Sequence, residues 1–376
     1  MTDIITKTED KALLIGLVTP NTPEGECLVS LAELERLADT AGIKTTAQLT
    51  QNRTAPDPAA YIGKGKLEEA KGIIEVNDIN IAVFDDELSP SQIKNAEDIL
   101  GIEVIDRTML ILEIFERHAR TSEGKLQVEI ARLRYTIPRL TGKGKSMSRL
   151  GGGGGGAGMG ARRGSGETKL EIERRDARAR IASLEKEIKQ LESARQIMRS
   201  RREKSGITNI AIAGYTNSGK STLLNHLTNA GILAEDKLFA TLDPTTRRLS
   251  LPNGTKVLLT DTVGLIRKLP HHLVKAFKST LDEINHADII LLMTDVSDPE
   301  YQNQFEVAKS LISELGAAEK PVIVVCNKID AAANPEQLTE DGGQQVFISA
   351  KTGYGIDKLL QKIQKTITNK ITKERE

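Results

Sequence analysis

Residues 206–228 read GITNIAIAGYTNSGKSTLLNHLT, and this stretch decides the fold of the second half of the chain. The apolar run 206–213 predicts a buried strand, and the residues after Ser221 have a helical pattern. Between them stands G-x-x-x-x-G-K-[ST], the loop that cradles phosphates with its backbone N–H groups. Lys220 would place its charge on the β- and γ-phosphates, and the Ser221 hydroxyl would ligate Mg²⁺. The other loop residues expected to contact the nucleotide are Gly214, Tyr215, Thr216, Asn217, Ser218 and Gly219.

Four further runs predict strands, and three of them end in motifs that suit a guanine nucleotide. They read VLLTDTVG (257–264), DIILLMTD (288–295), PVIVVCNKID (321–330) and VFISAK (346–351). Asp261 can hold Mg²⁺ through water, and the Gly264 N–H can sense the γ-phosphate. Asp330 can accept from N1–H and N2–H₂ of guanine, an arrangement that adenine lacks. The remaining candidate contacts are Thr262, Val263, Asn327, Lys328, Ile329, Ser349, Ala350 and Lys351.

Together these motifs predict an α/β domain with a mostly parallel sheet that binds GTP at the carboxyl ends of its strands. In DTVGLIRK (261–268), however, Leu265 stands where many guanine-nucleotide switches have a glutamine that orients the attacking water. A leucine cannot hydrogen-bond a water. One alternative source of catalysis is Asn217, which could help to hold a K⁺ beside the transition state; the other is that Asn217 only stabilises the loop. We expect Arg247, Arg248 and Arg267 to be solvated or to face RNA.

Residues 1–105 predict a separate, small α/β domain. The runs 12–18 and 79–85 read as buried strands, and 30–42 and 91–101 read as helices that each end at a glycine. This alternation favours a mostly parallel sheet. The stretch Gly63-Lys64-Gly65-Lys66 opens a further helix. It favours a cap or a contact with RNA phosphates over a second nucleotide site, because neither a Walker sequence nor G-x-G-x-x-G is present in this stretch.

Residues 106–204 predict a basic helical arm with a glycine-rich loop at 139–166. Apolar residues recur at helical spacing on both sides of the loop, which favours an antiparallel hairpin, and Arg195 interrupts the second stripe. Over residues 116–205 there are 23 Lys/Arg against 11 Asp/Glu, a net charge of +12, although the whole chain is neutral. From Ile130 to Gly166 there is no acid. This footprint suits phosphate backbones, whereas the alternative is a solvated linker. The eight bases of the acid-free stretch are Arg132, Arg134, Arg139, Lys143, Lys145, Arg149, Arg162 and Arg163.

Composition excludes several classes of protein. Cys27 and Cys326 lie far apart, so they form neither a disulfide framework nor a metal-ligand cluster. The amino terminus lacks the features of a secretory signal, and no apolar run approaches the roughly 18 residues of a membrane span. We therefore expect a cytoplasmic protein.

The arrangement resembles the translation-factor-related GTPases, and the whole chain resembles the HflX family of ribosome-associated GTPases. The resemblance rests on YIGKGKLEE (61–69), the basic glycine-rich arm, FATLDPTTR (239–247) and DTVGLIRK. It implies that Thr241 is the switch threonine that reaches Mg²⁺ beside Ser221; residue chemistry alone would equally allow Thr245 or Thr246. Lys220, Thr241 and Gly264 are then the candidate catalytic residues. The further nucleotide contacts implied by the switch are Phe239, Ala240, Leu242 and Asp243.

For function, the resemblance implies a monomeric GTPase, slow alone, that docks on the large ribosomal subunit and its rRNA and helps to separate stalled ribosomes. The cofactors are GTP and Mg²⁺, with K⁺ as the additional candidate. An alternative is a GTP-regulated factor that remodels rRNA or assembles subunits. A signalling or membrane-transport GTPase is disfavoured by the acid-free arm, and nothing indicates DNA as a partner.

Overall fold

The computed structural model describes residues 10–142, 164–204, 206–228, 238–239, 242–270, 273, 278–333 and 345–375. It divides into two compact units. Unit 1 comprises Met1–Arg117 and Leu126–Ile188, and unit 2 comprises His118–Lys125 and Lys189–Glu376. The short segment 118–125 therefore belongs with the carboxyl-terminal half of the chain, although both of its neighbours in sequence belong to unit 1.

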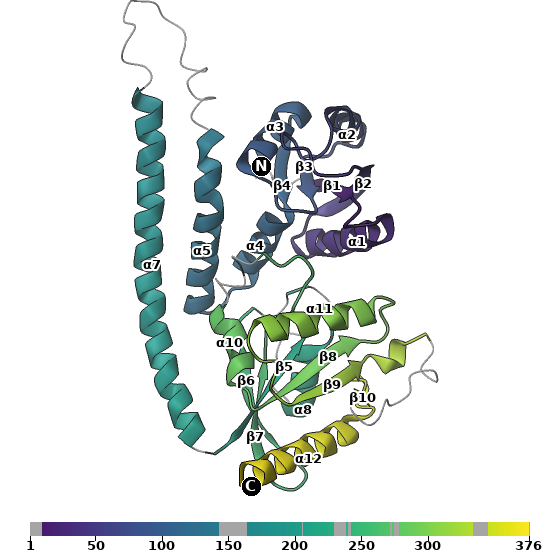
Figure 1. The fold of residues 1–376 in the computed structure, drawn as a ribbon, viewed down its shortest axis with the longest axis vertical. Coiled ribbons are helices and arrows are strands. Elements are labelled where there is room, and N and C mark those ends of the chain that lie inside the picture. Colours follow the sequence, from purple (N-terminus) through teal and green to yellow (C-terminus); the bar gives the residue numbers. More distant parts are fainter. Residues whose placement is uncertain are drawn as a thin grey trace, which may run out of the picture. The chain divides into compact units, whose positions relative to one another are not determined.

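Unit 1 is built on a four-stranded parallel sheet in the order β2-β1-β3-β4 (Figure 1). The strands are β1 (Lys11–Val18), β2 (Lys44–Asn52), β3 (Ile81–Phe84) and β4 (Glu103–Asp106). The helices that connect and follow them are α1 (Glu24–Thr40), α2 (Lys64–Asn77), α3 (Pro90–Leu100) and α4 (Arg107–His118). The predicted strands and helices are confirmed, but α1 begins six residues earlier than expected. The polar strand β2 was not predicted, because its side chains alternate in exposure at a sheet edge rather than forming an apolar run.

Both faces of this sheet are covered, which explains why β1 reads as a continuous apolar run. Leu13 and Ile15 pack in one core cluster with Leu67 of α2 and Leu100 of α3. On the opposite face, a Cβ added to Gly16 would lie 2.9 Å from the Cys27 sulfur of α1. The sheet is thus sandwiched between α2 and α3 on one side and α1 on the other.

A buried arginine connects three of these elements. The Arg107 guanidinium, at the start of α4, is 2.7 Å from a carboxylate oxygen of Glu33 on α1 and 2.8 Å from one of Asp85 after β3. It also donates to the carbonyl oxygen of Ser30 at 2.9 Å. All three charged side chains are at most 4% exposed. Because these side chains are shielded from solvent, each charge is stabilised by its opposite rather than by hydration.

The arm consists of α5 (Ser122–Thr136), a short 3₁₀ helix η1 (Ile137–Gly142) and the 41-residue α7 (Gly164–Lys204). Figure 1 shows α5 and α7 side by side. Arg180 of α7 pairs with Glu129 at 2.8 Å, and Arg134 pairs with Glu185. Leu184 is fully buried. This is the antiparallel hairpin that the apolar stripes predicted. Of the predicted loop 139–166, the first residues belong to η1 and the last to α7, and residues 143–163 lie outside the described residues.

Unit 2 contains a six-stranded sheet in the order β10-β9-β8-β5-β7-β6, in which only the β6–β7 pair is antiparallel. The strands are β5 (Thr208–Gly214), β6 (Thr245–Ser250), β7 (Lys256–Asp261), β8 (Ile289–Asp295), β9 (Val322–Asn327) and β10 (Gln345–Phe347). The helices are α8 (Lys220–Thr228), α10 (Lys278–His286), α11 (Tyr301–Glu314), the 3₁₀ helix η2 (Ile329–Ala331) and α12 (Ile356–Arg375). All five predicted strands are confirmed. The edge strand β6 was not predicted, because its sequence TTRRLS is mostly polar.

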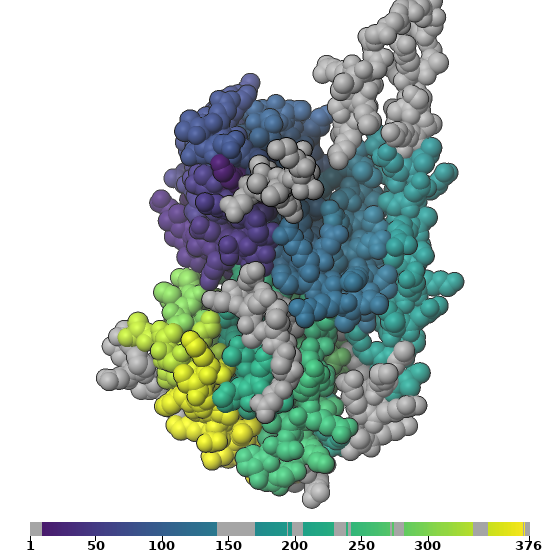
Figure 2. Space-filling view, turned by 180° about the vertical axis from the view of Figure 1, so that it is seen from behind, coloured from purple at the N-terminus to yellow at the C-terminus, as the bar shows by residue number. Residues whose placement is uncertain are grey.

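Two apolar cores hold the helices of unit 2 on opposite faces of the sheet. Leu223 of α8 and Leu359 of α12 belong to one core, and Ile284 of α10 and Ile312 of α11 belong to the other. Figure 2 shows α12, in yellow, at the surface, with polar residues on its outer side. The P-loop between β5 and α8 therefore rests on a sheet that is supported from both sides.

Within the described residues, none of the helices is long and apolar enough to cross a membrane. No group of His, Cys, Asp and Glu there could hold a metal ion by itself. Both cysteines are buried, and neither forms a disulfide.

Candidate nucleotide site

The P-loop is held tightly against the neighbouring strand ends. Gly219 has φ +91°, and a Cβ added there would lie 2.2 Å from the side-chain nitrogen of Asn327. Only glycine fits this backbone conformation and this space without strain. Asn327 is 2% exposed; its Nδ2 donates to the carbonyl oxygen of Ser218 at 2.8 Å, and its Oδ1 accepts from the backbone N–H of Ala350 at 2.9 Å. Asn327, at the end of β9, therefore joins its own loop to the P-loop and to the loop that carries Ala350. The sequence predicted these residues only as separate nucleotide contacts.

Two hydroxyls of the loop fit bound phosphates. Thr216 and Ser218 are 6% and 1% exposed, and neither hydroxyl oxygen has a hydrogen-bond partner among the described residues. A buried hydroxyl without a partner costs roughly 1–3 kcal/mol. Phosphate oxygens would supply the acceptors that these hydroxyls lack, so the loop fits the anion that its sequence predicts.

Lys220 is the buried cation of the site. Its side chain is 7% exposed, and Nζ donates to the carbonyl oxygen of Tyr215 at 2.8 Å. The pKa of Lys220 is lowered to about 8, mainly by burial; the Asp261 carboxylate raises it and the nearby Lys328 lowers it. A phosphate chain would stabilise the charged form, so nucleotide binding and protonation of Lys220 favour each other.

We expect GTP binding near pH 8 to take up protons at Lys220, and GTP affinity to fall as pH rises from 8 to 9. The reason is that the lysine is only partly protonated around its pKa of about 8, whereas the bound phosphates require the ammonium form. Above this pKa the loss approaches tenfold per pH unit. Calorimetry in two buffers with different heats of ionisation measures the uptake. Lys220→Arg is the matched control, since its guanidinium does not titrate; equal uptake in that variant would assign the proton to another group.

Ser221 and Asp261 lie together at the mouth of the loop. The Ser221 hydroxyl donates to a carboxylate oxygen of Asp261 at 2.7 Å, and Asp261 is fully buried at the end of β7. A hydroxyl and a carboxylate are the hard oxygen donors that Mg²⁺ prefers. The site thus fits this ion, with Ser221 as ligand and Asp261 beside it, and a bound Mg²⁺ would neutralise charge on the phosphates.

The segment after β7 is joined to the P-loop by backbone hydrogen bonds. Leu265 N–H donates to the Gly214 carbonyl at 3.0 Å, and the Leu265 carbonyl accepts from Thr216 N–H at 2.8 Å. Further along, Arg267 N–H donates to the Tyr215 hydroxyl at 2.9 Å. A Cβ on Gly264 would lie 2.7 Å from Thr216 and 3.2 Å from Lys220 Nζ. Gly264 is therefore packed directly on the loop that would hold the phosphates.

The Leu265 side chain points into the core and away from that loop. It is 1% exposed and packs with Ala213, Ile284 and Leu292. Leucine at this position thus helps to hold the segment after β7 against the P-loop, and it cannot orient a water. Thr262 and Val263 are also buried, and the Thr262 hydroxyl donates to the Ile212 carbonyl at 2.8 Å.

The expectation for Arg267 is wrong. Its guanidinium pairs with Glu300 at 3.1 Å and its side chain is only 14% exposed, so it faces neither solvent nor a free surface. Arg247 and Arg248 are exposed on β6.

The predicted guanine-binding residues converge at the ends of β9 and β10. Lys328 has φ +65°, and its ammonium is 2.7 Å from Asp295. Asp330 is exposed on η2, beyond Ile329. Ser349 is fully buried, and its hydroxyl accepts from Thr352 N–H at 3.1 Å, which shapes the loop that also carries Ala350 and Lys351. The Asp330 carboxylate is exposed, as its predicted role as an acceptor for guanine requires.

The other predicted switch segment, FATLDPTTR, is described only in part. Ala240 and Thr241 lie outside the described residues. Phe239 and Leu242 are buried, at 2% and 1% exposure. Asp243 was expected to contact the nucleotide, but its carboxylate accepts from the backbone N–H groups of Arg120 and Thr121 at 2.9 and 2.8 Å. No sequence pattern indicated this partnership, which joins residues more than 120 positions apart.

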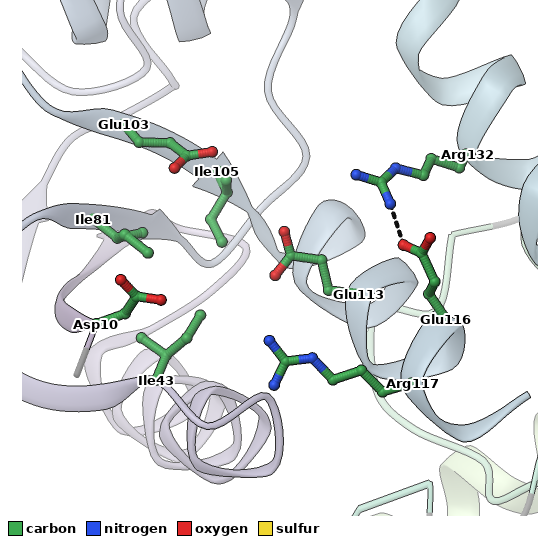
Figure 3. Close-up of a pocket in the computed structure, with 9 residues that line it drawn as sticks. All are labelled: Asp10, Ile43, Ile81, Glu103, Ile105, Glu113, Glu116, Arg117 and Arg132. Carbon is green, nitrogen blue, oxygen red and sulfur yellow. Dashed lines mark hydrogen bonds and ion pairs between the residues drawn. The ribbon is translucent and has the colours of Figure 1, made fainter. Parts of the chain in front are cut away.

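The pocket of unit 1 does not fit a second nucleotide. A pocket of about 380 Å³ lies at the amino ends of β3 and β4 (Figure 3). Nucleotides bind at the opposite, carboxyl ends of parallel strands. Burial raises the pKa of Glu113, as does the nearby Glu103, whereas Arg117 and Arg132 lower it. The titratable residues that line the pocket are four acids and two bases, Asp10, Glu103, Glu113, Glu116, Arg117 and Arg132. This excess of carboxylates repels phosphates.

Some bases of the acid-free stretch are committed to the fold of unit 1. Arg132 pairs with Glu116, and Arg134 pairs with Glu185. Arg139 stacks 3.4 Å from the ring centre of Tyr135 and donates to the Leu88 carbonyl at 2.7 Å. The other five bases lie outside the described residues. These three arginines therefore make contacts within the protein, which makes them weaker candidates for RNA contacts.

Comparisons with known proteins cover nearly the whole chain. Three family models match: GTP-binding GTPase N-terminal at residues 29–116, GTP-binding GTPase Middle Region at 118–202, and 50S ribosome-binding GTPase at 209–328. GTPase HflX of Caldanaerobacter subterraneus subsp. tengcongensis is 48% identical over 96% of this chain and 82% of its own length. GTPase HflX of Escherichia coli K12 is 40% identical over 91% and 80%. Among solved structures, a GTP-binding protein from Sulfolobus solfataricus in complex with GDP is 26% identical, covers 96% of this chain and 99% of its own, and has a TM-score of 0.46.

Proposed function

Because this chain belongs to the HflX family of GTPases and is therefore a GTP-hydrolysing enzyme, we propose that it docks on the large ribosomal subunit in its GTP-bound form and promotes ribosome splitting or rescue. The observation that carries the ribosomal part is the match of residues 209–328 to a 50S ribosome-binding GTPase. In this proposal, residues 1–105 form the amino-terminal domain, 106–204 the RNA-facing arm and 205–370 the GTPase domain.

The proposed roles of the site residues are those that the motifs and the family resemblance imply. Lys220 holds the β- and γ-phosphates, Gly264 senses the γ-phosphate through its N–H, and Thr241 completes the Mg²⁺ ligands beside Ser221. Asp330 accepts from guanine, with Lys328 and the Ala350 loop beside it. The support is that these loops meet at one edge of the unit 2 sheet, where Asn327 hydrogen-bonds to two of them.

Hydrolysis then depends on a group that the chain does not supply at position 265. The Leu265 N–H and carbonyl are both hydrogen-bonded to the P-loop, and its side chain is buried in the core. This segment therefore cannot present a water-orienting group unless these backbone hydrogen bonds break. A group supplied on the ribosome would make hydrolysis follow docking. GTP turnover would thereby be timed by the partner.

The test is steady-state GTP turnover by the full chain, alone and with purified large ribosomal subunits, with small subunits as the control. We expect strong stimulation by large subunits only. Clear turnover alone, with no stimulation, would contradict the proposal and locate the catalytic group within the chain. If that turnover required K⁺ and failed in Na⁺, Asn217, whose φ is +62°, would become the candidate that holds the ion.

For the arm, we expect replacement of Arg149, Arg162 and Arg163 by alanine to weaken binding to large-subunit rRNA and to reduce its salt dependence. Each phosphate contact removed lowers the slope of log K against log salt by about 0.7–0.9, so three contacts lower it by roughly 2–3. Binding measured from low to moderate salt gives both slopes. Replacing the internally paired Arg139 instead should leave the slope nearly unchanged. An unchanged slope in the triple variant would remove those three arginines from the interface.

A further inference from the structure

The side chain of Tyr215 reaches from the P-loop to the segment that follows β7. Tyr215 is the residue after the first glycine of the P-loop motif, and it is 3% exposed. Its hydroxyl accepts from the backbone N–H of Arg267 at 2.9 Å, and its carbonyl oxygen accepts from Lys220 Nζ at 2.8 Å. Tyr215 therefore contacts the lysine of the phosphate site through its backbone and the segment after β7 through its side chain.

This contact is one of three hydrogen bonds that join the two segments. The other two run between backbone groups: Leu265 N–H donates to the Gly214 carbonyl, and Thr216 N–H donates to the Leu265 carbonyl. The third depends on a side chain, so a substitution can remove it and leave the backbone pairing in place. A phenylalanine at position 215 keeps the ring and lacks the acceptor oxygen.

The pairing of the two segments places Gly264 beside the phosphate site. Gly264 is buried, and a Cβ added to it would lie 2.9 Å from Thr216 Cα and 3.2 Å from Lys220 Nζ. Lys220 is the residue whose ammonium would hold the β- and γ-phosphates. The backbone of Gly264 is therefore held next to the position where a γ-phosphate would bind.

We propose that Tyr215 is a positioning residue that favours GTP over GDP, because its hydroxyl holds residues 264–267 where the Gly264 N–H meets the γ-phosphate. GTP gains from this arrangement, whereas GDP has no γ-phosphate and binds equally well when the segment moves away. A hydrogen bond made in only one of two arrangements shifts the preference between the two ligands. The inference rests on the proposed function only for the role of Gly264.

Tyr215→Phe in the full chain tests the proposal. Titration with GDP and with a non-hydrolysable GTP analogue gives the ratio of the two Kd values. We expect the preference for the GTP analogue over GDP to fall about fivefold, the worth of one hydrogen bond, while GDP affinity stays unchanged. With the GTP analogue bound, the amide of Arg267 should also exchange its hydrogen faster than in the unaltered protein. A purely structural role would lower both affinities together, and an unchanged ratio would overturn the proposal.

Tyr301→Phe is the matched control. The Tyr301 hydroxyl accepts from the Gln302 side chain at 3.2 Å, at the exposed start of α11 in the same unit. This variant also loses a tyrosine hydroxyl and one hydrogen bond, but the lost bond does not reach the P-loop. Its ratio of Kd values should equal that of the unaltered protein. A similar fall in both variants would overturn the proposal, because the effect would then not be specific to the contact with Arg267.

Gly264→Ala shows whether the Tyr215 hydroxyl acts through Gly264. The new Cβ would lie 2.7 Å from the Thr216 side chain, so the segment could no longer pack in the same way on the P-loop. In this background, Tyr215→Phe should change the ratio of Kd values no further. A second fall of about fivefold in the double variant would contradict the proposal, because Tyr215 would then act independently of Gly264.

These measurements use no ribosomes, so they do not depend on the ribosomal part of the proposed function. If Gly264→Ala lowers the preference for the GTP analogue and Tyr215→Phe does not, the role of Tyr215 is contradicted and that of Gly264 stands. If neither variant changes the preference, both roles are contradicted. Absent stimulation by large ribosomal subunits, with the expected ratios in these variants, would contradict only the proposed function.

Discussion

Gly219→Ala is expected to lower GTP affinity by roughly 30- to 150-fold, because the new Cβ would lie 2.2 Å from the side-chain nitrogen of Asn327. Asn327 must move, and its two buried hydrogen bonds, to Ser218 and from Ala350, are then lost. At about 1–1.5 kcal/mol each, they account for about 2–3 kcal/mol, which gives that range of affinity. Titration with a fluorescent GTP analogue measures it.

Gly254→Ala is the matched control for backbone strain. Gly254 also has a left-handed backbone, with φ +81°, but nothing lies within 4 Å of a Cβ added there. Both variants therefore carry a similar conformational cost of about 1 kcal/mol, but only Gly219→Ala disturbs the junction of the three loops. Similar GTP affinities in the two variants would mean that the junction around Asn327 does not shape the site.

The elements that were predicted correctly are specified by short, local sequence patterns. The strands that end in Gly214, Asp261 and Asn327 are apolar runs followed by motifs whose spacing is fixed by the phosphate and guanine groups they suit. Such patterns need no knowledge of distant residues. The edge strands β2 and β6 were not predicted because one side of each is polar and their pairing depends on a neighbouring strand.

The roles that sequence could not assign are those set by distant partners. Arg195 interrupts the apolar stripe of α7, and the structure pairs it with Glu123 at the start of α5, so the interruption is an ion pair between the two helices. Leu265 was recognised as unable to orient a water, but its place in the core with Ile284 became visible only once β5, β7 and α10 were assembled. In the same way, the sequence predicts Asp243 only as a nucleotide contact, because its hydrogen bonds with Arg120 and Thr121 join residues more than 120 positions apart.

The second large effect concerns stability. Arg107→Leu should destabilise unit 1 by about 3–5 kcal/mol, because it removes the guanidinium that pairs with the buried carboxylates of both Glu33 and Asp85. Hydrogen exchange resolves the two units: amides of β1 and β3 should lose protection by roughly 150- to 5,000-fold, whereas those of β5 and β8 should keep theirs. The further replacement of Glu33 by Gln and Asp85 by Asn should restore part of the loss, since the two buried negative charges that Arg107 neutralised are then gone.

Arg53→Leu provides the comparison within the same unit. Arg53 pairs with Asp57 at 3.3 Å, but both side chains are about one-third exposed, so water can replace the lost partner and the expected loss is at most about 1 kcal/mol. If Arg107→Leu cost no more than this, Glu33 and Asp85 would have to be hydrated or protonated in the folded protein. A large difference would instead show that the buried ion pairs fix α1, β3 and the start of α4 together.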